Sequence, residues 1–382
     1  ILKMETNYRS DCKIVKCADR FIAQNRMRYE KHMICGTTVC SSEAVETVRL
    51  TDYEQQCGCI VSRIKRYDGQ GRQAILYKNN ESAVALIDLL SREGIRYTCR
   101  EREMTFFSSA VVEDIRAYLR LAANPRDIEA FSRLYYKLGC SRLIFLYTKE
   151  NIEEYPSVFD CAASFSSLPE YRRGLLLKSR DLFRRLLVMC PADAIETIRK
   201  ELGYDRFIEH RLSGFSKISA YQKLAVLTQV ASGIKRPVEL NARLAALSLA
   251  VRESADPEAA VVLSTIHSSK GMEFDTVYLL DIYDDILPSC DAKARRKEED
   301  CSAYENEVRL FYVAATRAKR KLVMFESSRL NGEPVAPSPF IRQFLQEKPV
   351  PKARTEEETI EFVPEMRVRH ASFGDGTIRS VE

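Results

Sequence analysis

The chain has 382 residues, of which 45% are hydrophobic and 30% are charged, and its 59 basic and 54 acidic residues give a net charge of +5. This length predicts about two domains, with room for a small third. No apolar run is long enough to cross a bilayer, which argues against a membrane-spanning protein. Without a signal-like opening, we expect a cytoplasmic protein, and the start at Ile1 predicts an excised fragment. The small basic surplus fits either a nucleic-acid partner or an ordinary mixed surface.

Twelve cysteines are scattered along the chain without a repeating frame. The spacings typical of metal sites are Cys35/Cys40 and Cys57/Cys59, and neither pair makes the two CxxC knuckles of a zinc site. The sequence therefore predicts no metal, and it favours free thiols in a reducing cytoplasm.

The first 100 residues predict alternating helices and strands. Apolar residues at helical spacing predict a helix from Ile14 to Ile22, after a cap at Ser10. The later elements, read from the same periodicities, are a strand at Val45–Leu50, a helix at Tyr53–Tyr67, a strand at Ala74–Tyr77, a helix at Glu81–Arg92 and a strand at Ile95–Thr98. This alternation is typical of a parallel sheet covered by helices.

From about 104 to 255 the apolar residues fall at helical intervals without clear strand signals, which predicts an all-helical region. Strand patterns return afterwards. They predict strands at Val261–Ile266, Thr276–Asp281 and Lys321–Phe325, with a helix at Tyr304–Arg317. The sequence thus predicts one α/β domain, made of 1–103 and 256–345, that a helical insertion of 104–255 interrupts.

The last residues predict a linker and a tail. Residues 346–360 contain two prolines and little apolar content, which is typical of a linker. In the tail, 361–382, Met366–His370 and Thr377–Ser380 predict a β-hairpin around a turn at Asp375-Gly376. So few residues cannot bury a core alone, so we expect the tail to be incomplete or to dock on another surface, such as a protein partner.

Two arginines are candidates for phosphate binding. Arg317 follows a predicted helix that packs on the sheet, and a guanidinium held there can place two donors on a nucleotide γ-phosphate. The same position is also typical of an arginine at a helix C-terminus. Arg9 lies beside Tyr8 in NYRS, where the ring can stack on a purine while the cation reaches a phosphate. That tetrapeptide is equally consistent with a turn that enters a helix.

The segment around the predicted strand 261–266 offers further candidates, because loops after parallel strands bind ligands in α/β sheets. Gly271 permits a close backbone approach, and the Glu273 carboxylate can accept a hydrogen bond from a ribose hydroxyl. Side chains that can donate to nucleic-acid phosphates are Ser264, Thr265, His267 and Lys270. A lone histidine is more often an ordinary loop residue, and no second histidine lies at metal-ligand spacing.

The segment YKNNES (77–82) closes a strand and opens a helix. Tyr77 can serve as a stacking platform for single-stranded nucleic acid, and Lys78 or Asn79 can contact its phosphates. The alternative is structural, because asparagine and serine are natural caps for the free amides of a helix.

The order of these segments carries more information than each one alone. NYRS, LYKNN, TIHSSKGMEF and FYVAATRAK, in this order, resemble the motifs of the UvrD/Rep family of superfamily 1A DNA helicases. The resemblance is strong for 1–100 and 258–328 and weak for the helical insertion, and the tail VRHASFGDGTI also resembles the family's carboxyl-terminal segment. It implies an α/β, RecA-like parallel sheet of the P-loop NTPase fold, used as a second motor domain and interrupted by an all-helical subdomain.

The resemblance also implies roles for single residues. Tyr8 would stack on adenine, Arg9 and Arg317 would contact the γ-phosphate as catalytic residues, and Gly271 and Glu273 would lie at the nucleotide, with Glu273 at the ribose. Single-stranded DNA would be contacted by Tyr77, Asn79, Ser264, Thr265, His267 and Lys270.

No G-x-x-x-x-G-K-[ST] loop occurs in the chain, although an ATP-driven motor needs one to hold phosphates. The resemblance implies that ATP and Mg²⁺ are shared with an N-terminal RecA-like domain upstream of Ile1, so we expect the fragment alone to hydrolyse no ATP. The whole protein would move 3′ to 5′ on single-stranded DNA and unwind duplex DNA, in repair or replication.

One departure from the family pattern concerns duplex DNA. The family's RGIG-like turn is replaced here by RLYYKLGCSRL (133–143), so the chain also fits a translocase that unwinds poorly. A different class of protein, a non-catalytic nucleic-acid-binding or regulatory module, would keep the same scaffold without a partner ATPase domain. A helicase–nuclease is disfavoured, because the FGDG tail stands where a nuclease domain is expected.

Overall fold

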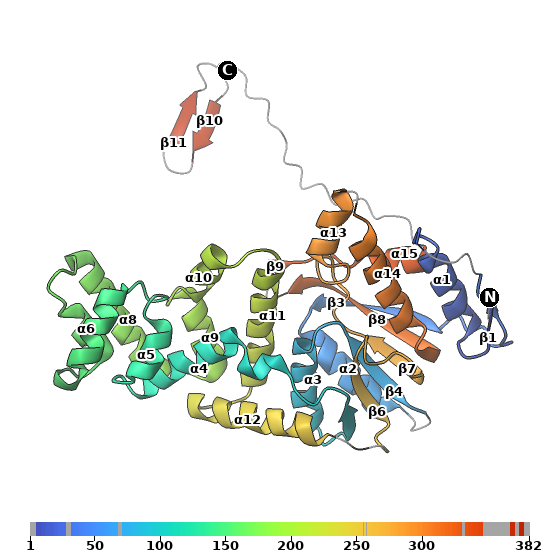
Figure 1. Cartoon of the computed structure of the whole chain (residues 1–382), viewed down its shortest axis with the longest axis horizontal. Helices are drawn as coiled ribbons and strands as arrows, with labels where there is room; N and C mark the ends of the chain where they lie inside the picture. Colours follow the sequence, from blue (N-terminus) through green and yellow to red (C-terminus); the bar gives the residue numbers. More distant parts are fainter. Residues whose placement is uncertain are drawn as a thin grey trace. The chain divides into compact units, whose positions relative to one another are not determined.

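The computed structural model describes residues 5–27, 32–67, 71–254, 256, 258–298, 300–330, 333–346, 367–370 and 374–377. The chain divides into two compact units, Ile1–Leu345 and Gln346–Glu382. The first unit contains a parallel sheet with helices on both faces and a group of helices inserted between two of its strands (Figure 1).

The sheet is built from segments on both sides of the helical region. Its strand order is β3-β8-β7-β4-β6-β5, and each neighbouring pair on this path is parallel. The strands are β3 (Val45–Asp52), β4 (Gln73–Tyr77), β5 (Tyr97–Cys99), β6 (Val261–Thr265), β7 (Phe274–Leu279) and β8 (Ala318–Leu330), with β9 (Glu333–Pro334) antiparallel to β8. The α/β prediction is confirmed.

The central strands are apolar runs because both faces of the sheet are covered. Successive side chains point to opposite faces: Ala74 and Leu76 of β4 face one core, whereas Ile75 and Tyr77 face the other. The first core is covered by α1 (Cys12–Ile22), α14 (Ser302–Ala315) and α15 (Pro339–Leu345), and the second by α2 (Gln55–Arg66) and α3 (Glu81–Arg92) (Figure 1).

Between β5 and β6 the described chain forms helices and no strand. They are η1 (Thr105–Ser108), α4 (Ala110–Ala123), α5 (Ile128–Leu134), α6 (Arg142–Asn151), η2 (Ile152–Glu154), α7 (Val158–Ala163), α8 (Glu170–Leu186), α9 (Pro191–Lys200), α10 (Tyr204–Arg211), α11 (Gly214–Ala231) and α12 (Pro237–Glu253). α13 (Cys290–Lys297) precedes α14 and was not predicted.

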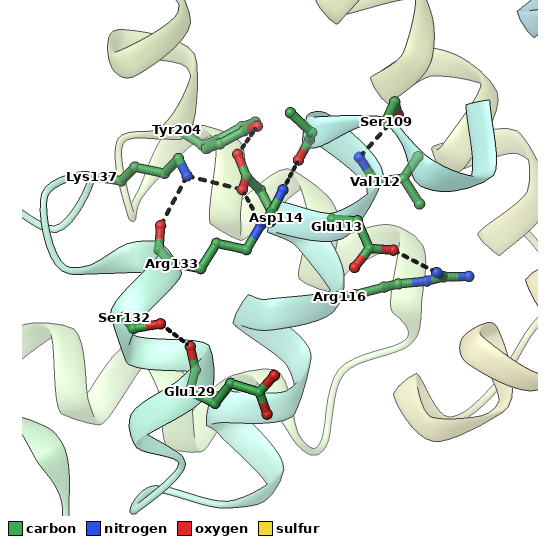
Figure 2. Close-up of polar contacts among 11 residues, drawn as sticks. Ser109, Val112, Glu113, Asp114, Arg116, Glu129, Ser132, Arg133, Lys137 and Tyr204 are labelled. Atoms are coloured by element: carbon green, nitrogen blue, oxygen red, sulfur yellow. Dashed lines mark hydrogen bonds and ion pairs between the residues drawn. The ribbon is translucent and has the colours of Figure 1, made fainter. Parts of the chain in front are cut away.

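A buried carboxylate joins three of the inserted helices, as Figure 2 shows. The Asp114 side chain of α4 is 3% exposed. Its Oδ1 accepts from Arg133 Nε at 2.7 Å and from Lys137 Nζ at 2.9 Å, and its Oδ2 accepts from the Tyr204 hydroxyl at 2.8 Å. A buried charge needs such partners, so this cluster fixes α5 and α10 against α4.

A small parallel pair lies outside the main sheet. β1 (Thr6–Asn7) pairs with β2 (Ile34–Cys35), which brings Cys35 beside the start of α1. A disulfide joins Cys12 to Cys35, so the prediction of free thiols was wrong for these two residues. Their pairing depends on a contact between distant segments, which cysteine spacing does not encode. Ten other cysteines are free, and the described residues contain no cluster of potential metal ligands.

The second unit contains a hairpin whose turn was predicted incorrectly. β10 (Arg367–His370) and β11 (Gly374–Thr377) are antiparallel, and Val368 pairs with Gly376. Asp375-Gly376 therefore lies inside β11, where Asp375 pairs with Arg369. The remaining predicted hairpin residues and nearly all of the predicted linker lie outside the described residues. No described helix has the length and apolar character that a membrane crossing requires.

Asp281 is buried at the carboxyl end of the sheet. It follows β7 with a φ of 60°, and its side chain accepts from the Tyr53 hydroxyl at 2.9 Å and from the Ser82 hydroxyl. Burial raises the pKa of Asp281 from its ordinary 3.8 to about 6, although both hydroxyls act in the opposite direction. This acid therefore stabilises the fold when protonated, and that contribution is lost as the pH rises through 6.

We predict that the wild type loses about 1.4 kcal/mol of unfolding free energy, relative to Asp281→Asn, between pH 5 and pH 7.5. The asparagine cannot ionise, so it removes the cost of burying a charge at the higher pH. Urea denaturation of both proteins at the two pH values measures this difference. If the difference in unfolding free energy between the two proteins is the same at both pH values, the raised pKa of Asp281 is contradicted.

Candidate functional site

Three segments meet at the amino-terminal edge of β7 and β8. Arg9, from the loop after β1, donates from Nε to Glu273 Oε2 at 2.6 Å, and Lys319 Nζ lies 3.8 Å from the same oxygen. The Phe274 amide donates to Arg317 O at 3.0 Å, so β7 begins beside the end of α14. The structure thus brings the predicted residues Arg9, Glu273 and Arg317 together.

Arg317 is half-buried and is held by uncharged acceptors. Its Nε donates to Val313 O at 3.1 Å, its Nη1 to Met272 O at 3.0 Å and its Nη2 to the Thr316 hydroxyl at 3.3 Å. Among the described residues no carboxylate forms an ion pair with it. Burial lowers the pKa of the Arg317 guanidinium, and the nearby Arg9 charge lowers it further. The Arg317 guanidinium has five N–H donors, and the two that remain free can bind an anion such as phosphate.

The loop that carries Tyr8 and Arg9 is fixed by its neighbours. Asn7 Oδ1 accepts from the backbone amides of Arg9 at 2.8 Å and Ser10 at 3.0 Å. The Asp11 amide donates to Lys319 O at 2.7 Å, which ties the loop to β8. The Asp11 carboxylate accepts from the Lys13 amide and so caps α1. Arg9 therefore projects from a rigid turn.

Tyr8 presents an aromatic ring to solvent. The residue is 74% exposed, and one face of its ring lies on Gly36, where an added Cβ would come within 2.5 Å of Cδ1. Only glycine allows this approach without displacing the ring. Gly36 was missed in the sequence, because nothing in CGTT indicates a contact with Tyr8.

An open groove of about 720 Å³ borders Arg9. Its charged lining consists of Arg9, Lys319, Arg320 and Lys321 against the acidic Glu43 and Asp275, with Asp11 at the base of the loop. Each of the four basic side chains is paired with a carboxylate: Arg9 and Lys319 with Glu273, Arg320 with Asp275 and Lys321 with Glu46.

The loop from Ile266 to Glu273 connects the two edges of the sheet. It leaves the carboxyl end of β6, and Glu273 stands at the amino end of β7. Buried Ser269 anchors the loop by donating to Ile266 O at 2.7 Å. Gly271 has a φ of 86°, a conformation in which glycine is favoured. Lys270 and Gly271 are exposed, at the surface of this crossing segment.

The predicted nucleic-acid residues Asn79, Thr265 and His267 lie near the carboxyl edge. β4 and β6 are in register, with Tyr77 opposite Thr265, so Asn79 and His267 follow neighbouring strand ends. His267 is exposed, and Asn79 and Thr265 are partly exposed. The Thr265 hydroxyl donates to Ser268 Oγ at 2.8 Å. These three polar residues therefore lie at the same edge of the sheet.

The structure contradicts two of the predicted nucleic-acid contacts. Tyr77 is 0% exposed, in the core between the sheet and α3, and its hydroxyl donates to Glu101 Oε2 at 2.8 Å. Ser264 is also 0% exposed, and its hydroxyl donates to Thr265 O at 2.9 Å. Tyr77 cannot be a stacking platform, because strand alternation turns its side chain into the core.

Residues 2–157 and 192–329 match the family profile described as the UvrD-like helicase C-terminal domain. The two matched segments include β3 to β7 and all of β8 except its last residue, and they exclude part of the inserted helices.

Curated relatives of the chain carry helicase names. A protein named putative ATP-dependent DNA helicase YjcD, from Bacillus subtilis, is 29% identical over 90% of this chain and 46% of its own length. DNA helicase II of Escherichia coli is 26% identical over 100% of this chain and 58% of its own length. ATP-dependent DNA helicase Rep of Buchnera aphidicola is 26% identical over 84% of this chain and 52% of its own length. The chain therefore spans about half the length of these relatives.

The two tyrosines differ in a way that stability measurements can test. We predict that Tyr77→Ala lowers the free energy of unfolding by about 3–5 kcal/mol, because it empties a core site. Tyr8→Ala should change it by no more than about 0.5 kcal/mol, because that ring is exposed. Urea denaturation followed by circular dichroism measures both. A neutral Tyr77→Ala would show that the ring is not part of the core.

Proposed function

Because this chain belongs to the UvrD-like helicase C-terminal domain family, we propose that it is the second RecA-like domain of an ATP-dependent DNA helicase. The first such domain, which would carry the P-loop that this sequence lacks, would come from a preceding part of the same protein. The main support is the convergence of Arg9 and Arg317 beside Glu273, from distant points in the chain, at one edge of the sheet.

ATP would bind between the two domains and supply the γ-phosphate that is transferred to water. The half-buried Arg317 fork, which has no carboxylate partner among the described residues, fits a phosphate that arrives from the facing domain. Arg9 would join it at the same phosphate, and Tyr8 would stack on adenine. Glu273, which holds Arg9 in this structure, would then be free to accept from the ribose hydroxyl, beside Gly271.

Both arginines would act electrostatically. They would stabilise the charge that redistributes over the phosphate oxygens during transfer, and they would reach those oxygens only when the domains close. The described residues offer no cluster of potential metal ligands, so the preceding domain would hold Mg²⁺. By the same reasoning this chain alone would hydrolyse no ATP.

Single-stranded DNA would run along the carboxyl edge, past Asn79, Thr265, His267 and Lys270. ATP-driven closing and opening of the two domains would move the strand past these contacts. We propose 3′ to 5′ movement and duplex unwinding, in DNA repair or replication in the cytoplasm. The tail would dock on a protein partner.

The role of Arg317 is testable in a polypeptide that joins this chain to its P-loop domain. We predict that Arg317→Ala lowers DNA-stimulated ATP turnover by about a thousandfold, because the charge on the transferred phosphate loses its partner. Phosphate release measures turnover, and circular dichroism checks the fold.

Arg320→Ala is the matched control. Arg320 is a neighbouring arginine whose side chain is 76% exposed and lies 3.6 Å from Asp275. Its loss should change turnover by less than about twofold, since surface pairs contribute little. Wild-type turnover in Arg317→Ala would refute the proposed role.

The Tyr8 platform is testable through the glycine beneath it. We predict that Gly36→Ala weakens binding of a fluorescent ATP analogue by about tenfold, as Tyr8→Ala should, because the new methyl group displaces the stacking ring. Gly58→Ala is the control, since nothing lies within 4 Å of a Cβ built at that position. Equal affinities for Gly36→Ala and Gly58→Ala would exclude stacking on Tyr8.

A further inference from the structure

Lys78 follows β4 at the carboxyl edge, yet its charge is turned inward. Its Nζ donates to the two carboxylate oxygens of Glu307 at 2.6 and 2.7 Å and to Ile286 O at 2.7 Å. The side chains of Lys78 and Glu307 are 15% and 14% exposed. All three ammonium protons have acceptors, so Lys78 is not available for a DNA phosphate and instead joins β4, the loop after β7 and α14.

The carboxylate of this pair is equally well held. Ser289 donates from its hydroxyl to Glu307 Oε1 at 3.1 Å. An ion pair shielded from water is stronger and more directional than an exposed one, and breaking it leaves an uncompensated charge. The amino-terminal half of α14 is therefore fixed to the strand ends where the proposed DNA path lies.

α14 continues from this pair to the nucleotide edge. Glu307 and Ala315, the last residue of α14, are eight residues apart, and a helix that rises 1.5 Å per residue spans about 12 Å over that length. Arg317 follows two residues after the helix ends. Val308, Phe311, Ala314 and Ala315 of its inner face are 0% exposed against the sheet. The helix therefore behaves as a rigid rod between the two edges.

We propose that Lys78 and Glu307 are a positioning pair that couples occupancy of the DNA edge to the placement of Arg317. Neither residue touches nucleotide. DNA held by Asn79 would fix the segment that carries Lys78, and Glu307 would transmit that position along α14. This inference rests on the proposed function, and it gives the molecule a second connection between its edges besides the loop from Ile266 to Glu273.

The test compares ATP turnover with and without oligo(dT), in the polypeptide that joins this chain to its P-loop domain. For Lys78→Ala and Glu307→Ala, the ratio of DNA-stimulated to DNA-free kcat should fall about tenfold. KM for ATP should stay within about twofold, because the pair does not contact the nucleotide. Lys78→Arg should restore most of the ratio, since it keeps a charge that can pair with Glu307.

A matched pair elsewhere in the fold controls for stability. Lys223 of α11 lies 2.5 Å from Glu81 of α3, and these side chains are 13% and 12% exposed. Lys223→Ala thus breaks an equally buried pair that does not involve α14. It should lower the melting temperature by as much as Lys78→Ala does, and it should leave the stimulation ratio unchanged.

The possible outcomes distinguish a failure of this inference from a failure of the proposed function. If the wild type is stimulated by DNA while Lys78→Ala and Glu307→Ala lose only melting temperature, like Lys223→Ala, the pair is structural and the inference is overturned. If the wild type hydrolyses no ATP with or without DNA, the proposed function fails, and this inference fails with it. A selective loss of stimulation that Lys78→Arg repairs supports the coupling.

Discussion

The packing of α1 and α14 on one face of the sheet determines where the two arginines lie. Phe21 and Phe311 have ring centroids 4.9 Å apart, and Phe340 of α15 lies 5.2 Å from Phe21. Burying each ring contributes about 1.5–3 kcal/mol. Two like charges near a protein surface repel by at most about 4 kcal/mol at contact distance. The shared aromatic core therefore outweighs the repulsion between Arg9 and Arg317, which Glu273 further reduces by pairing with Arg9.

The same sheet separates two kinds of chemistry. The cationic groups proposed for a nucleotide gather at its amino-terminal edge, whereas the polar groups proposed for DNA follow strand ends at its carboxyl edge. Two rigid connections join the edges: the crossing loop after β6 and the helix α14, which a buried ion pair fixes at Lys78. A motor needs such connections, because a change at one site must alter geometry at the other.

Local patterns predicted much of this architecture. The apolar runs of β4 and β6, the spacing of α1 and the helical insertion follow from periodicity, and the family motifs indicated the arginine pair. The sequence did not predict that the Tyr77 side chain is buried, because a strand covered on both faces shows no alternation of apolar and polar residues. The contact of Gly36 with Tyr8, the Cys12–Cys35 disulfide and the Lys78–Glu307 pair join distant segments. Such pairings depend on the sheet order, which local sequence does not encode.

A double-mutant cycle tests most directly whether Arg9 and Arg317 serve one phosphate. ATP turnover would be measured for Arg9→Ala, Arg317→Ala and the double variant, in the polypeptide that includes the P-loop domain. Groups that act as a unit are non-additive, so we predict that the double variant is little slower than the slower single variant. Losses that multiply would show that the two arginines act independently, and would contradict a shared phosphate site.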